Sequence, residues 1–208
     1  MSIHRSPGAQ VLKIEVCSDT RMAKLDAPDG PYTAIILAKA GLVRYGMGHR
    51  ITVDLPAPTL YYAVSQGALA IEIRADDSVS RKLLEPLVHT PTEWATAAER
   101  ACLRVLEGGC SVPVGVNSAL EAGQLSLTGC VTALDGHLHV QHTLDEPVVS
   151  KADAEALGAR LAHILIKTGA KEILDDVAVD RERRAGQNKT AQEVEKIEAV
   201  MEGSTVPA

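Results

Sequence analysis

The stretch Leu125-Ser-Leu-Thr-Gly-Cys-Val-Thr-Ala-Leu-Asp-Gly-His-Leu-His-Val140 decides the fold of the second half of this chain. Large apolar residues alternate here with polar or small ones, a pattern typical of a strand that buries one face. The pair Asp135-Gly136 is a strong signal for a two-residue hairpin turn, and the alternation resumes after it on a return strand. With a further strand over residues 112–116, the sequence predicts a three-stranded antiparallel sheet.

Two amphipathic helices flank this predicted sheet. The first carries Cys102 on an apolar stripe at helical spacing and ends at Gly108-Gly109, because glycine tolerates the left-handed conformation that closes a helix. The second follows a weak capping box at Ser150, and Gly169 closes it. Residues 89–178 are therefore predicted to form a small α+β domain, with three antiparallel strands and helices.

The preceding part of the chain has an α/β pattern. The apolar run Ala34-Ile-Ile-Leu-Ala38 fits a strand buried on both faces, and residues 61–73 fit extended structure with alternating faces. Residues 76–87 fit a short helix. We therefore expect an α/β segment over residues 19–88. The charged residues 179–208 are expected to be a mobile tail.

Composition argues against several classes of function. The chain has 208 residues, a formal charge of −6, no Phe and one Trp, which disfavours a phosphate-backbone binder and leaves little for base stacking. The four cysteines show no CxxC spacing, and His137 and His139 have no third ligand at suitable spacing, so we expect no metal site. There is no secretory signal and no apolar run of membrane-spanning length. These features predict a cytoplasmic protein with neither a nucleic-acid nor a membrane partner.

Three parts of the sequence carry recognisable motifs. They are Thr20-Arg-Met-Ala-Lys-Leu-Asp26 with Tyr32-Thr-Ala-Ile-Ile-Leu-Ala-Lys-Ala-Gly-Leu-Val-Arg-Tyr-Gly46, then Tyr62-Ala-Val-Ser-Gln-Gly-Ala-Leu-Ala-Ile-Glu-Ile-Arg74, then Glu99-Arg-Ala-Cys-Leu-Arg-Val-Leu-Glu-Gly-Gly-Cys-Ser-Val-Pro-Val-Gly115. In this order they resemble the C-terminal portion of the porphobilinogen deaminase (hydroxymethylbilane synthase) family, and the last resembles its cofactor-attachment segment. The resemblance covers roughly residues 20–177, and three ordered matches are far more specific than one.

The resemblance implies a transferase of tetrapyrrole (haem) biosynthesis. Family members join four porphobilinogen molecules with release of ammonia, on a dipyrromethane primer held by a thioether to the loop cysteine, here Cys110. The family enzyme is a monomer with two domains similar to periplasmic binding proteins and a small α+β domain. Residues 19–88 would be a remnant of the former, and residues 89–178 the domain with the cysteine loop.

The candidate site residues follow from the same motifs. A cysteine on a Gly-flanked loop is accessible to an electrophilic pyrrole, whereas Cys102 on the apolar stripe is expected to be a buried structural residue. Each pyrrole carries an acetate and a propionate, so arginines are natural partners. The motif positions indicate Arg21 and Arg44 as cofactor-binding residues, although an arbitrary arginine is more often a solvated surface residue. Gln66 is a further polar candidate.

The chain also departs from the family pattern. The family's first half, with its catalytic aspartate, is not matched, so we assign no catalytic residue. Residues 1–18 carry none of the motifs; Glu15, Val16 and Cys17 stand where the family has Arg-Gly-Asn, and Ser65 replaces a glycine. A truncated chain that is inactive alone is the resulting expectation. The alternative is a non-catalytic remnant that binds pyrroles or associates with an intact subunit.

Overall fold

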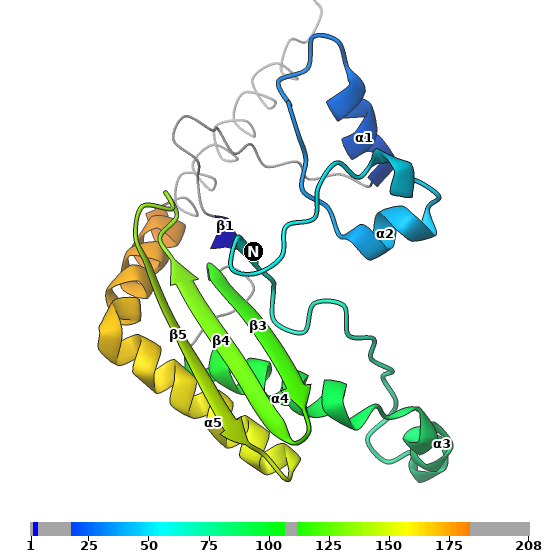
Figure 1. Cartoon of the computed structure of the whole chain (residues 1–208), viewed down its shortest axis with the longest axis vertical. Coiled ribbons are helices and arrows are strands. Elements are labelled where there is room, and N and C mark those ends of the chain that lie inside the picture. Colours follow the sequence, from blue (N-terminus) through cyan, green and yellow to red (C-terminus); the bar gives the residue numbers. More distant parts are fainter. Residues whose placement is uncertain (1, 4–17, 107–111, 184–208) are drawn as a thin grey trace, which may run out of the picture.

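The computed structural model describes residues 2–3, 18–106 and 112–183. A three-stranded antiparallel sheet lies at the centre of the second half (Figure 1), as the alternating pattern predicted. Its strands, in the order β3-β4-β5, are β3 (Val114–Glu121), β4 (Gln124–Thr132) and β5 (His139–Pro147).

The two hairpins of this sheet differ from the sequence expectation in their turns. Thr132 pairs with His139, so Asp135-Gly136 lies within a longer loop over residues 133–138 and does not form a two-residue turn by itself. The tight turn is Ala122-Gly123, between β3 and β4, where φ is 49° and 80°. Two consecutive positive φ values match the right-handed twist of the paired strands.

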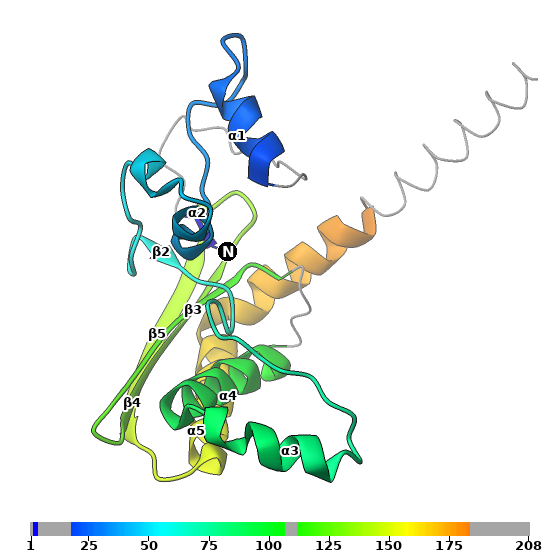
Figure 2. The same ribbon diagram turned by 90° about the vertical axis from the view of Figure 1, so that its right-hand side faces the viewer.

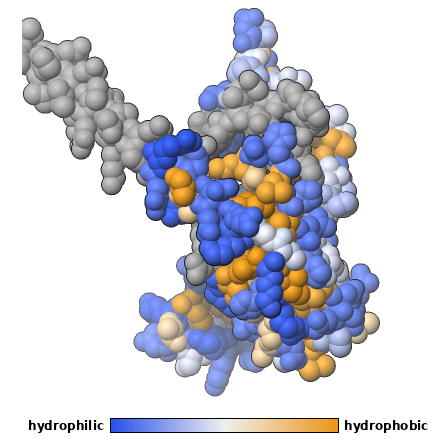
Figure 3. All heavy atoms as spheres, turned by 90° about the vertical axis from the view of Figure 1, so that its left-hand side faces the viewer, coloured by the Kyte–Doolittle hydropathy of each residue, from blue (hydrophilic) through white to orange (hydrophobic). Residues whose placement is uncertain are grey.

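Helices α4 (Thr90–Val105) and α5 (Lys151–Leu165) cover one face of the sheet (Figures 1 and 2). From β4, Leu125, Leu127 and Val131 enter the shared core, each with 0% exposure. The hydroxyl of Ser150 accepts a hydrogen bond from the N–H of Asp153 (3.2 Å), which confirms the predicted cap of α5. On the side of the molecule that carries α5, apolar patches reach the surface between hydrophilic residues (Figure 3).

The helix that begins at α5 is kinked where the sequence predicts its end. A π-helical turn, η3 (Ile166–Ala170), follows α5, and residues 171–183 are helical beyond it. Gly169 has φ 112°, in the left-handed region that favours glycine, so the break at this residue is confirmed. Within the described ranges, no helix is both long and apolar enough to cross a bilayer.

The first part of the chain consists of short elements. They are α1 (Ser18–Asp26), α2 (Lys39–Arg44), η1 (Gly48–Arg50), β2 (Leu60–Tyr61), α3 (Ser78–Leu84) and η2 (Glu85–Leu87), with β2 paired to β1 (Ser2–Ile3). In Figure 1, α1 and α2 lie together beyond one end of the sheet, and α3 projects beside the start of α4. The helix expected over residues 76–87 is confirmed as α3 and η2.

The strand expected over residues 34–38 is wrong, and the extended segment expected over residues 61–73 is almost unpaired. Residues 34–38 form no strand and are partly or fully exposed, and between residues 62 and 75 the only pairing is an isolated bridge from Tyr62 to Val116. A strand exists only where a neighbour accepts its backbone hydrogen bonds, and the described residues offer these segments no further partner. Leu69 and Ile71 are consequently 86% and 60% exposed. The α/β sheet expected over residues 19–88 is therefore not formed in the described structure.

Candidate cofactor site

Cys110 belongs to the segment 107–111, which lies outside the described residues. The chain enters this segment from Leu106, which caps α4 and is 3% exposed. It re-enters the described structure just before β3, where the carbonyl oxygen of Pro113 accepts a hydrogen bond from the N–H of Thr132 (3.0 Å). Both ends of the segment are therefore fixed to the helix–sheet core.

A hollow of about 440 Å³ lies beside these two ends. Leu106 and Val112, which flank the segment 107–111, both line it. Further lining comes from the kinked helix, where Lys171 and Asp175 form an ion pair with a Nζ–Oδ2 distance of 2.7 Å. The ends of the predicted attachment segment thus border a recess with apolar walls and a few charged groups.

Cys102 is a core residue, as its place on the apolar stripe predicted. Its side chain has 0% exposure. Burial raises the pKa of the Cys102 thiol to about 12, and the negative charge of Glu99 adds to this shift. The thiol therefore stays protonated at neutral pH, and a protonated, buried thiol is a poor nucleophile.

Arg21 lies on α1 and Arg44 lies on α2, the two helices near the start of the described chain. Arg21 is partly buried on α1, and Arg44 is exposed at the end of α2. The Nε atom of Arg21 is buried and has no hydrogen-bond partner within the described part of the chain. Asp26 binds Arg50 (Oδ1–Nη2 2.6 Å), which ties the end of α1 to η1.

Gln66 lies on an exposed turn that a buried carboxylate holds. The backbone N–H of Ser65, whose φ is 60°, donates to Oε2 of Glu99 (2.6 Å). The other oxygen of Glu99, Oε1, accepts from the hydroxyl of Ser118 on β3 (2.5 Å). Glu99 is only 8% exposed, and the sequence analysis assigned it no role.

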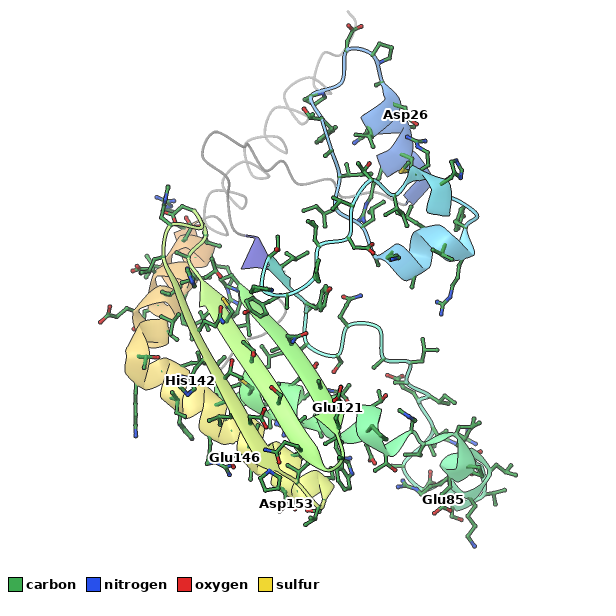
Figure 4. All side chains as sticks on the ribbon, viewed as in Figure 1. Asp26, Glu85, Glu121, His142, Glu146 and Asp153 are labelled. Carbon is green, nitrogen blue, oxygen red and sulfur yellow. The ribbon has the colours of Figure 1, made fainter. Side chains whose placement is uncertain are left out.

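The structure does not bring all the predicted residues to one place. Arg21 and Arg44 belong to the unit of α1 and α2, marked by Asp26 in Figure 4, while the turn of Gln66 is attached to α4 and β3. No group of three or more His, Cys, Asp or Glu side chains is placed to hold a metal ion in the ranges that the structure describes.

Comparison with known proteins gives two matching family models. The model for the porphobilinogen deaminase C-terminal domain matches residues 94–167. The model for the porphobilinogen deaminase dipyrromethane cofactor binding domain matches residues 2–82. This second match begins within residues 1–18, the segment that carries none of the quoted motifs.

Curated relatives give the same family. Over 174 residues the chain is 48% identical to a porphobilinogen deaminase of Synechococcus elongatus. The aligned region covers 84% of this chain and 53% of the relative. The chain is 44% identical over 161 residues to the porphobilinogen deaminase of Yarrowia lipolytica, covering 77% and 48%. With that of Saccharomyces cerevisiae it shares 43% identity over 165 residues, covering 78% and 50%. The chain thus spans about half the length of the relatives it matches.

Proposed function

The chain belongs to the porphobilinogen deaminase family, and from that membership we propose that it is the cofactor-carrying portion of a hydroxymethylbilane synthase and is inactive alone, with Cys110 as the point of dipyrromethane attachment. The bound dipyrromethane would prime the stepwise condensation of four porphobilinogen molecules, each with loss of ammonia. The proposal also assigns residues 19–88 to the family's cofactor-binding domain, where an α/β sheet would need strand partners beyond those that the described residues offer.

The observation that carries the proposal is the placement of the two residues that flank the segment 107–111. Its two ends, at Leu106 and Val112, are anchored beside a hollow at the end of α4. Cys102 and Cys130 are instead buried at 0% and 4% exposure. An alkylation site needs an accessible thiol, which neither buried cysteine provides.

The arginines supply the electrostatic part of the proposal. A growing chain of pyrroles accumulates acetate and propionate groups, and a guanidinium binds a carboxylate through two parallel hydrogen bonds. Arg21, with its buried Nε lacking a partner in the described structure, and Arg44, exposed at the end of α2, would bind these groups. Gln66 would offer an uncharged amide to the same ligand.

Intact-mass measurement tests the attachment. We expect the purified chain to exceed its sequence mass by one dipyrromethane and to give colour with a pyrrole-specific aldehyde reagent. Cys110→Ala is expected to lose both signals, and Cys130→Ala, the matched control, to keep them. An added mass that persists in Cys110→Ala would refute the assignment, as would its absence from the wild-type chain.

A second candidate function is a non-catalytic pyrrole-binding or subunit-binding role. The exposed apolar side chains of Leu69 and Ile71 favour it, because they offer a surface for association. No residue here matches the family's catalytic aspartate, so we expect little turnover of porphobilinogen by the chain alone under either proposal. Dipyrromethane loaded on Cys110 supports the first proposal, whereas binding of porphobilinogen or of an intact family member by a chain without that added mass supports the second. Sustained turnover by the purified chain would exclude the second role.

A further inference from the structure

We infer that Glu99 is a positioning residue that fixes the turn carrying Gln66 to the same helix that leads into the Cys110 segment. The anchoring itself consists of two hydrogen bonds to the Glu99 carboxylate. Its consequence for ligand binding rests on the proposed function.

The two oxygens of the Glu99 carboxylate join segments that are far apart in the sequence. Oε2 accepts from the backbone N–H of Ser65 (2.6 Å), and Oε1 accepts from the hydroxyl of Ser118 (2.5 Å). The side chain is 8% exposed, so water competes weakly for either bond. A carboxylate suits this place because it accepts two hydrogen bonds and donates none.

The turn needs such an anchor because its conformation is unfavourable. Ser65 has φ 60°, a left-handed conformation that residues with a side chain rarely adopt. Within the turn, the N–H of Gln66 donates to the carbonyl of Ala63 (3.0 Å) and the N–H of Ala68 to the carbonyl of Ser65 (3.2 Å). These local bonds close the turn but do not attach it to the rest of the molecule. Glu99 provides that attachment.

The anchored region ends at this turn. Before it, Tyr62 and Val116 exchange two backbone hydrogen bonds of 3.0 and 2.8 Å, which fix the chain to β3. After it, Leu69 is already 86% exposed. Glu99 is thus the last hydrogen-bonded attachment before the exposed segment, and Gln66 lies directly beside it.

Helix α4 connects this anchor to the attachment segment. Glu99 and Leu106 lie seven positions apart on one buried helix and its cap, which sets them about 10 Å apart along the axis. The helix is rigid because its buried face packs on α5 and the sheet. Through Glu99, the turn of Gln66 is therefore held at a fixed offset from Leu106, the cap of α4. A ligand that binds Gln66 would meet it at a fixed place on the helix–sheet core.

Amide hydrogen exchange and ligand affinity together test the inference. In Glu99→Ala, we expect exchange at residues 65–67 to accelerate at least about tenfold, while β4 amides keep their protection. The affinity for porphobilinogen should fall about fivefold or more. Glu99→Gln should restore most of both, because its amide oxygen can accept from Ser65 and its NH₂ can donate to the Ser118 hydroxyl. The control is Glu93→Ala, which removes a half-exposed carboxylate of the same helix that forms an ion pair with Lys151 at the surface.

The outcomes separate this inference from the proposed function. Unchanged exchange at residues 65–67 in Glu99→Ala would overturn the inference, and so would faster exchange with unchanged porphobilinogen affinity. A wild-type chain that fails to bind porphobilinogen would defeat the proposed function and the ligand role of Glu99, while accelerated exchange would still support the anchor. Should Glu99→Ala not fold, Ser118→Ala replaces it, with a smaller acceleration expected at the same residues.

Discussion

The α carbon of Gly158 on α5 lies so close to α4 that a Cβ atom added there would be 2.0 Å from the carbonyl oxygen of Ala98. No side chain fits at this distance, and the obstacle is backbone, which cannot rotate away. The contact of the two helices therefore depends on the hydrogen atom that glycine has in place of a side chain.

We expect Gly158→Ala to lower the free energy of unfolding by about 3 kcal/mol, because α4 and α5 must separate to admit the methyl group. Chemical denaturation measures the change. The matched control is Gly41→Ala on α2, where an added Cβ meets no atom within 4 Å, so that variant should be neutral or slightly stabilised. Equal destabilisation by both substitutions would contradict the close packing at Gly158.

Ser65→Gly is expected to stabilise the chain by about 1 kcal/mol. Glycine removes the steric cost of the left-handed conformation at φ 60°, and the Ser65 hydroxyl it deletes is buried without a hydrogen-bond partner among the described residues. Its backbone N–H still donates to Glu99. Thermal or urea unfolding gives the difference, and Ala122→Gly, at φ 49° in a hairpin turn, should show a comparable gain. A loss of stability in Ser65→Gly would show that its side chain matters more than its backbone.

The buried thiol of Cys102 should make stability depend on alkaline pH. Its pKa is raised from 9.0 to about 12 in the folded chain, so its contribution is fully present below pH 9 and is lost as pH rises toward 12. The slope is about 1.4 kcal/mol per pH unit in that window. Unfolding free energies from pH 8 to 11 measure it, with Cys102→Ala as the reference without this slope. Parallel pH profiles for the two proteins would rule out the shift.

The same residue should resist alkylation. At pH 8 the folded chain is expected to leave Cys102 unmodified by iodoacetamide, because only about one thiol in ten thousand is ionised at a pKa of about 12. Denaturant should expose it to rapid modification. Peptide mass spectrometry distinguishes the cysteines, and quick labelling of native Cys102 would be incompatible with its burial.

The exposed apolar segment should drive self-association. Leu69 at 86% and Leu83 at 73% exposure have no apolar cover among the described residues. We expect Leu69→Asp with Leu83→Asp to raise the monomeric fraction at high protein concentration, as followed by light scattering. Val179→Asp, which changes a 66% exposed residue on the helix 171–183, serves as the control. The same degree of association in the wild-type chain, the double variant and the Val179→Asp control would indicate that another surface is responsible.

The sequence predicts well where an element is decided by its own pattern. The alternation at Leu125 and Leu127, the cap at Ser150 and the break at Gly169 all reappear in the structure. The strand predicted over residues 34–38 is absent because a strand needs a hydrogen-bonding partner elsewhere in the chain, and an apolar run alone does not supply one. The division of the chain at residue 88 stays a prediction.

For the candidate site too, local sequence patterns could be read, whereas contacts between distant residues could not. The roles that the motifs indicate for Arg21, Arg44, Gln66 and Cys110 stay predictions. The role of Glu99 depends on hydrogen bonds to Ser65 and Ser118, which are remote in sequence. One local signal was present: an acidic residue stands directly beside Ala98, within the apolar stripe of α4. A carboxylate in that position requires buried donors, and the structure supplies two.

The rigid span of α4 between Glu99 and Leu106 has a geometric consequence. Inserting one residue there would rotate the helix end by about 100° and advance it by about 1.5 Å. The turn of Gln66 and the helix end at Leu106 would then lose their present relative placement, even if every side chain in both places were retained. Substitutions along this span should be tolerated far better than any change in its length.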